Sequence, residues 1–124
     1  MIRPDIETEE DITNLVNQFY TKVRNDELLA PVFNSIIKDN WEGHLQTMCN
    51  FWSSILLYSK RYLNDPMAKH LPMPLEKKHF DKWLMLFEET IDETFAGCTA
   101  TTAKTRAYNI ARIMKSVKNI SLKK

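Results

Sequence analysis

The chain has 124 residues, enough for a single domain (residues 1–124) that buries its own hydrophobic core. Its seventeen basic and sixteen acidic side chains nearly cancel, and no apolar run approaches the roughly 18 residues of a membrane helix, so neither nucleic acid nor a membrane is an expected partner. Only two glycines occur, which favours helices over a turn-rich β fold and excludes a glycine-rich phosphate loop.

The first predicted helix runs from about Glu9 to Arg24. Thr8 and Asp11 have the spacing of a capping box at its start, with aspartate in place of glutamate. Its apolar residues recur at helical spacing: Ile12, Leu15, Val16, Phe19, Tyr20 and Val23. After the break at Asn25 and Asp26, the segment from Leu28 to Phe33 is predicted to form a short turn of helix.

The second long helix is predicted from about Asn40 to Tyr58. One of its faces carries His44, Met48, Phe51, Trp52 and Ile55, at offsets typical of a single helical stripe. The breadth of this apolar surface predicts burial against more than one neighbour.

The segment from Asp65 to Pro74 is predicted to be a short, proline-bound turn of helix. Asp65 can cap it and Pro66 can occupy its first position, whereas Pro72 ends it. This leaves His70 on about one and a half turns, in a segment too short to be an ordinary packing helix.

Two further long helices complete an all-α domain. The third runs from about Leu75 to Phe95, with Gly97 as its expected C-terminal cap. The fourth is predicted to be capped near Thr99 and to end near Asn119. Glu88, Glu89, Asp92 and Glu93 are expected to form a solvated face.

Three polar-tipped side chains, Tyr20, His44 and Trp83, lie on otherwise apolar stripes. Each needs a hydrogen-bond partner when it is buried. Taken singly, Tyr20 and Trp83 fit ordinary core residues, and His44 fits either a boundary histidine or a functional one. His79, in the first turn of the third helix, fits a boundary residue or the edge of a pocket.

Considered with His70, these residues fit a haem pocket. One histidine cannot hold zinc, which takes three or four protein ligands, but it can hold a haem iron because the porphyrin supplies four nitrogens. The chain has no Cys-x-x-Cys-His motif, so haem would be bound without thioether bonds. Cys49 and Cys98, as free thiols beside six methionines, fit a reducing cytoplasm.

The sequence also resembles the group III (P-type) truncated haemoglobins. The matching segments are Phe19-Tyr20, Pro31-Val-Phe33, Trp41-Glu-Gly-His44, Asn50-Phe51-Trp52, Lys69-His70-Leu71 and His79-Phe80 through Trp83-Leu-Met-Leu-Phe87-Glu-Glu-Thr. The resemblance spans about residues 12–115. It implies a 2-on-2 helical sandwich of four main helices plus short connecting helices, enclosing haem b held non-covalently.

The resemblance also implies roles for individual residues. His70 would be the proximal iron ligand, and Tyr20, Trp83 and His44 would form the polar distal side, with His44 as a gate. Phe33 would wedge against the haem, and Met48, Phe51 and Trp52 would line the distal wall. Lys69, Arg61 and His79 are candidates for the haem propionates by position.

The function expected from this resemblance is binding of O2, NO or CO by a cytoplasmic monomer. Nitric oxide detoxification or peroxidase-like chemistry would also require an electron donor, an unidentified reductase, because the chain contains no flavin or nicotinamide domain. The alternative is a cofactor-free helical interaction module in which the same polar residues merely pack.

Overall fold

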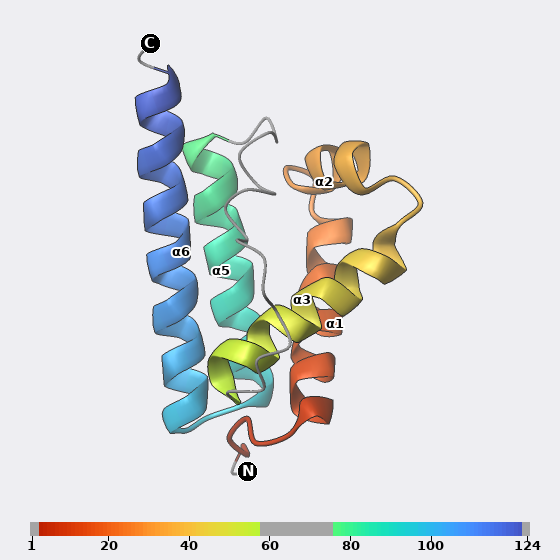
Figure 1. Ribbon diagram of the computed structural model, residues 1–124, viewed down its shortest axis with the longest axis vertical. Coiled ribbons are helices and arrows are strands. Elements are labelled where there is room, and N and C mark those ends of the chain that lie inside the picture. The colour runs from red at the N-terminus through yellow and green to blue at the C-terminus, as the bar shows by residue number, and fades with distance from the viewer. Residues whose placement is uncertain (1–2, 58–75, 123–124) are drawn as a thin grey trace.

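The structure, a computed structural model, describes residues 3–57 and 76–122, with residues 116–122 described by their backbone alone. Within these ranges the chain is helical and contains no strand. The helices are α1 (Glu9–Asn25), α2 (Ala30–Ile37), α3 (Trp41–Leu56), α5 (Lys77–Thr94) and α6 (Cys98–Leu122), shown in Figure 1. No helix in the described ranges combines the length and hydropathy needed to cross a bilayer.

The four long helices agree with the sequence prediction. The capping box of α1 is present, since Thr8 Oγ1 accepts from the Asp11 backbone N–H at 3.1 Å and Asp11 Oδ2 accepts from the Thr8 N–H at 3.1 Å. The short helix was predicted too early, because α2 begins at Ala30 and continues to Ile37. Asp26 occupies the preceding turn, where its carboxylate accepts from the Leu28 and Leu29 N–H groups.

The helices form two pairs that pack on one another. Helix α1 packs against α3 and α5, and it also contacts α2. Helices α5 and α6 run side by side in opposite directions (Figure 1), joined by ion pairs between Lys104 and Asp92 at 2.8 Å and between Lys115 and Asp81 at 2.9 Å. This arrangement is the predicted 2-on-2 sandwich, with α1 and α3 as one pair and α5 and α6 as the other.

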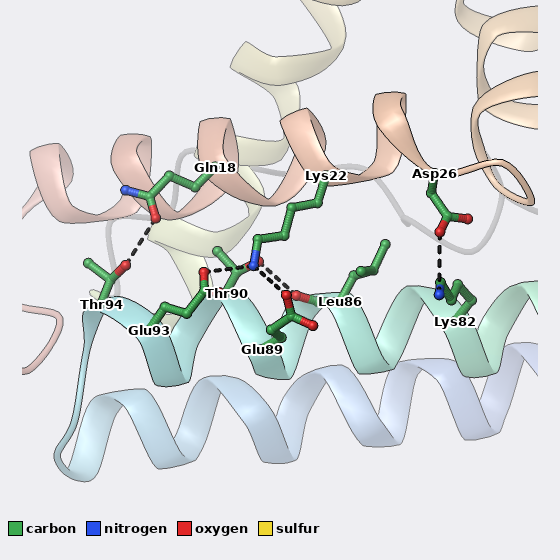
Figure 2. A network of polar contacts seen from close by, with 9 residues as sticks. All are labelled: Gln18, Lys22, Asp26, Lys82, Leu86, Glu89, Thr90, Glu93 and Thr94. Atoms are coloured by element: carbon green, nitrogen blue, oxygen red, sulfur yellow. Dashed lines mark hydrogen bonds and ion pairs between the residues drawn. The ribbon is translucent and has the colours of Figure 1, made fainter.

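A polar seam joins α1 to α5 along the edge of the core (Figure 2). Lys22 Nζ donates to Glu89 at 2.8 Å and to Glu93 at 2.7 Å, and Thr94 Oγ1 donates to Gln18 at 2.9 Å. The acidic face of α5 was expected to be only solvated; it is exposed, but these carboxylates pair with Lys22. Such half-exposed pairs contribute about 0–1 kcal/mol each, so their main effect is to set the register between α1 and α5.

The start of α6 is capped from the other end of the chain. Asp5 Oδ2 accepts from the Thr99 N–H at 3.0 Å, and Oδ1 accepts from the Ala100 N–H at 2.8 Å. The predicted cap at Thr99 is therefore wrong, since the helix already begins at Cys98. The predicted cap at Gly97 is also displaced, because Phe95 is the C-cap of α5. Gly97 instead has φ +137°, and a Cβ there would lie 2.5 Å from Asp5 Cγ.

Removing this long-range cap should destabilise the fold. Burial by itself would raise the pKa of Asp5, but the N–H groups of Thr99, Ala100 and Ile6 outweigh it and hold that pKa below its ordinary value of 3.8. The ionised carboxylate therefore stabilises the folded protein at pH values above 3.8. This contribution is lost as the pH falls through the lowered pKa of the folded state. We expect Asp5→Ala to lower the free energy of unfolding by about 1–2 kcal/mol at neutral pH, measured by urea denaturation.

Two variants control this prediction. Asp5→Asn keeps an oxygen acceptor but cannot titrate, so it should retain part of the stability at neutral pH and lose the acid dependence. Asp39→Ala removes an exposed carboxylate elsewhere and should leave stability nearly unchanged. Equal effects of Asp5→Ala and Asp39→Ala would contradict the role of the cap.

Candidate functional site

Tyr20 is the centre of an aromatic cluster built by the first three helices. Only 1% of its surface is exposed, and the His44 ring of α3 lies edge-on at a centroid distance of 5.0 Å. The ring of Phe33, from α2, lies 6.4 Å away, and that of Trp41 lies 6.0 Å away. The structure thus brings together three of the residues assigned to the site from the sequence, Tyr20, His44 and Phe33.

Trp83 of α5 is fixed by a stack of rings. Its indole lies parallel to Phe87 at 5.7 Å with an interplanar angle of 6°, and Phe87 stacks in turn on Trp52 at 4.8 Å. Phe19, beside Tyr20 in the sequence, presents its edge to Trp83 at 5.6 Å. Because Phe19 also contacts the Tyr20 ring at 4.8 Å, it connects Tyr20 with Trp83.

Two hydrogen-bond donors in this cluster are buried without a partner among the described residues. They are the Tyr20 hydroxyl and the Trp83 indole N–H. Leaving such a group unpaired costs about 1–3 kcal/mol, so a ligand that accepts from both would recover this energy. The Nε2 atom of His44 is buried as well.

The Tyr20 hydroxyl keeps its proton at any physiological pH. Burial raises its pKa far above the ordinary value of 10.0, and the nearby Trp83 indole opposes this only in part. The two groups do not reach hydrogen-bond geometry with each other. Both are therefore neutral N–H or O–H donors, suited to an acceptor that carries partial negative charge.

Helix α3 supplies the apolar residues assigned to the distal wall. Met48 and Phe51 are 5% and 6% exposed, and Trp52, in the ring stack with Phe87, is 1% exposed. His44 is half-buried and also lines an open hollow of about 460 Å³. The other residues of this hollow are Ile36, Ile37, Asn40, Gly43 and Thr47. His44 thus contacts Tyr20 on one side and a surface hollow on the other.

His79 is buried and caps the start of α5. Its Nδ1 accepts from the Glu76 backbone N–H at 2.9 Å, and the Glu76 side chain accepts from the His79 backbone N–H, forming a capping box. This interaction assigns the proton of a neutral ring to Nε2. Any contact of His79 with a haem propionate would therefore be made through Nε2.

The proximal residues assigned from the sequence lie outside the described residues. His70, Lys69 and Arg61 fall in the range 58–75, so their placement stays a prediction. Within residues 3–57 and 76–122, no group of three or more histidine, cysteine, aspartate or glutamate side chains could hold a metal ion.

Trp41, to which the sequence pattern assigned no role, is 7% exposed at the start of α3. Its indole N–H donates to Asn34 Oδ1 at 3.0 Å, and its ring contacts those of Tyr20 and His44. The spacing of three residues between Trp41 and His44 places both on one face and could have suggested a shared role. The contact with Asn34 of α2 requires the tertiary fold.

Comparison with known proteins places the chain among globins. The family described as Bacterial-like globin matches residues 5–119. A group 3 truncated hemoglobin of Campylobacter jejuni is 39% identical over 88 residues, 68% of this chain and 69% of that protein. The crystal structure of the group III truncated hemoglobin from Campylobacter jejuni matches with a TM-score of 0.85 at 32% identity, covering 94% of each chain. That of the truncated oxygen-avid haemoglobin from Bacillus subtilis matches with a TM-score of 0.72 at 26% identity, covering 86% of this chain and 92% of that one.

Proposed function

Because this chain belongs to the bacterial-like globin family and matches its group III truncated haemoglobins, we propose that it binds haem b non-covalently and holds a diatomic ligand beside Tyr20 and Trp83. The observation that carries the proposal is the pair of buried donors without partners, Tyr20 Oη and Trp83 Nε1. They come from α1 and α5, which the polar seam of Figure 2 joins. A partner-free pair of donors in a core is costly unless a ligand accepts from them.

Haem supplies an iron that needs a single axial side chain and leaves one coordination position open for O2, NO or CO. In our proposal His70 provides that side chain. Phe33 and Met48 would pack against the haem, and Phe51 and Trp52 would complete the apolar wall. Lys69, Arg61 and the Nε2 atom of His79 would face the propionates.

The distal donors decide what the site can do with its ligand. Hydrogen bonds from Tyr20 and Trp83 stabilise partial negative charge on a diatomic ligand and slow its escape, and the same polarisation favours cleavage of an O–O bond. The site therefore supports nitric oxide detoxification or peroxidase-like chemistry as well as binding. Turnover would require electrons from a reductase, which would be a protein partner. We also propose that the protein is a cytoplasmic monomer.

The visible spectrum of the purified protein tests the haem proposal directly. After expression with haem supplied, we expect a Soret band and a shift of that band when CO is added to the reduced protein. The absence of a Soret band under these conditions would overturn the proposal and favour a cofactor-free interaction module.

His44 is expected to control ligand access. It contacts Tyr20 and lines the open hollow beside α2, so we expect a shorter side chain to open a path between them. We predict that His44→Ala speeds CO rebinding after flash photolysis severalfold. Thr47→Ala, which alters the same hollow one turn away, should leave the rate nearly unchanged. Equal rates in wild type and His44→Ala would remove His44 from the access route.

A further inference from the structure

A second hollow, of about 330 Å³, lies between α1 and α2. The described residues that line it are Thr21, Arg24 and Asn25 of α1 and Asn34 of α2. Arg24 carries the only formal charge among these four, and none of them is acidic. The volume is at the lower end of the range for small-molecule sites, so the hollow has room for a small ligand.

The Arg24 side chain is held against the Trp41 ring, but its charge is not balanced by a carboxylate of the described residues. Its guanidinium carbon lies 4.6 Å above the centre of the Trp41 ring. Within the described part of the chain no carboxylate pairs with it, although Lys22, Lys82, Lys104 and Lys115 each have an acidic partner there. A guanidinium stacked on an aromatic face keeps its N–H edge available for a bidentate acceptor.

The two asparagines add further donors beside this edge. Asn34 Oδ1 accepts from the Trp41 indole N–H at 3.0 Å, which turns the amide so that its NH2 group is the part left for a ligand. Asn25 Nδ2 donates to the Thr21 carbonyl at 2.9 Å, and this NH2 group carries a second N–H. The hollow therefore combines one uncompensated cation with amide donors.

We propose that this hollow binds a small oxyanion, with phosphate or a phosphate monoester as the chemical class. The anion would be held by the Arg24 fork and the Asn34 amide and would tie α1 to α2. It would also fix the Trp41 ring, which packs against Tyr20 and His44. Occupancy of this site would thereby be transmitted to the aromatic cluster through a single side chain.

The indole N–H signal of Trp41 in a 1H–15N NMR spectrum provides the test. Phosphate or glycerol phosphate is titrated into the purified, CO-saturated reduced protein, with ionic strength held constant by sodium chloride. We expect saturable shifts of the Trp41 signal. Tighter binding of glycerol phosphate than of phosphate would assign the site to organic phosphates, and the reverse order would assign it to the free ion.

Three variants test whether phosphate binds in this hollow. Arg24→Gln should weaken binding about tenfold or more, since it removes the charge-assisted hydrogen bonds. Asn34→Asp keeps the acceptor for the Trp41 N–H but places a carboxylate beside Arg24, so it should abolish binding while the indole signal persists. Arg106→Gln makes the same charge change at an exposed site on α6 and should bind like wild type.

The outcomes that would overturn the proposal are specific. A shift that grows linearly with phosphate and never saturates would show a general ionic effect. Equal affinities in Arg24→Gln and Arg106→Gln would exclude Arg24 as the anion ligand. Because the same titration of the haem-free protein also reports on Trp41, failure here is distinct from failure of the haem proposal.

Discussion

Replacement of His70 with glycine should remove the proximal bond to the haem iron. The chain has three histidines; of the other two, His44 lies against Tyr20, and His79 uses Nδ1 to cap α5. His70 is the proximal ligand that the resemblance to group III truncated haemoglobins implies and that we propose. We expect His70→Gly protein to lose haem during purification or to lack the iron–histidine stretching band in the resonance Raman spectrum of the reduced form.

Added imidazole gives a control within the same variant. It can enter the space left by the side chain and restore an axial nitrogen, so haem retention should recover. His79→Asn keeps an acceptor for the Glu76 N–H and should preserve the iron–histidine band of the wild type. A normal band in His70→Gly without imidazole would show that another residue holds the iron.

Tyr20→Phe should have opposite effects on ligand binding and on stability. In the ligand complex the hydroxyl donates to an acceptor with partial charge, a hydrogen bond of about 1.5–3 kcal/mol, so its loss should speed oxygen dissociation roughly 10- to 100-fold. In the haem-free protein the same hydroxyl is buried without a partner among the described residues. Its removal there should raise the free energy of unfolding by about 1 kcal/mol. Stopped-flow dissociation and urea denaturation measure the two effects.

Trp83→Phe is the matched comparison for the second donor. It keeps an aromatic ring that can stack on Phe87 and removes the indole N–H. If both donors reach the same ligand, the remaining donor compensates in each single variant. The change in the free energy of oxygen dissociation in the double variant should therefore differ from the sum of the changes in the two single variants. An unchanged oxygen dissociation rate in Tyr20→Phe would remove Tyr20 from the donor pair.

The long helices could be predicted from the sequence because their information is local. The stripe of α1 and the Thr8–Asp11 capping box lie within one segment, and the observed helix, Glu9–Asn25, ends one residue beyond the prediction. The same periodicity marked Tyr20, His44 and Trp83 as polar tips on buried faces. The spacing of apolar residues therefore identifies these three side chains as polar groups on buried faces, whereas their assignment to a site also needed His70 and the family resemblance.

What the sequence could not supply depends on contacts between distant segments. The cap of α6 comes from Asp5, more than ninety positions away, so a search for a cap beside the helix selected Thr99 instead. The lack of hydrogen-bond partners for Tyr20 and Trp83 among the described residues is likewise a property of the packed core. The Arg24–Trp41 stack joins side chains from two helices and has no signature at short range.

The positions of the tryptophans have a practical consequence for spectroscopy. Trp41, Trp52 and Trp83 are all the tryptophans of the chain, and all three are buried in the aromatic cluster or the ring stack beside the proposed haem site. Haem absorbs at the wavelengths where indole emits, so resonance energy transfer would leave the loaded protein almost dark. Intrinsic fluorescence would return as haem departs, and the rate of cofactor release could be followed without any added label.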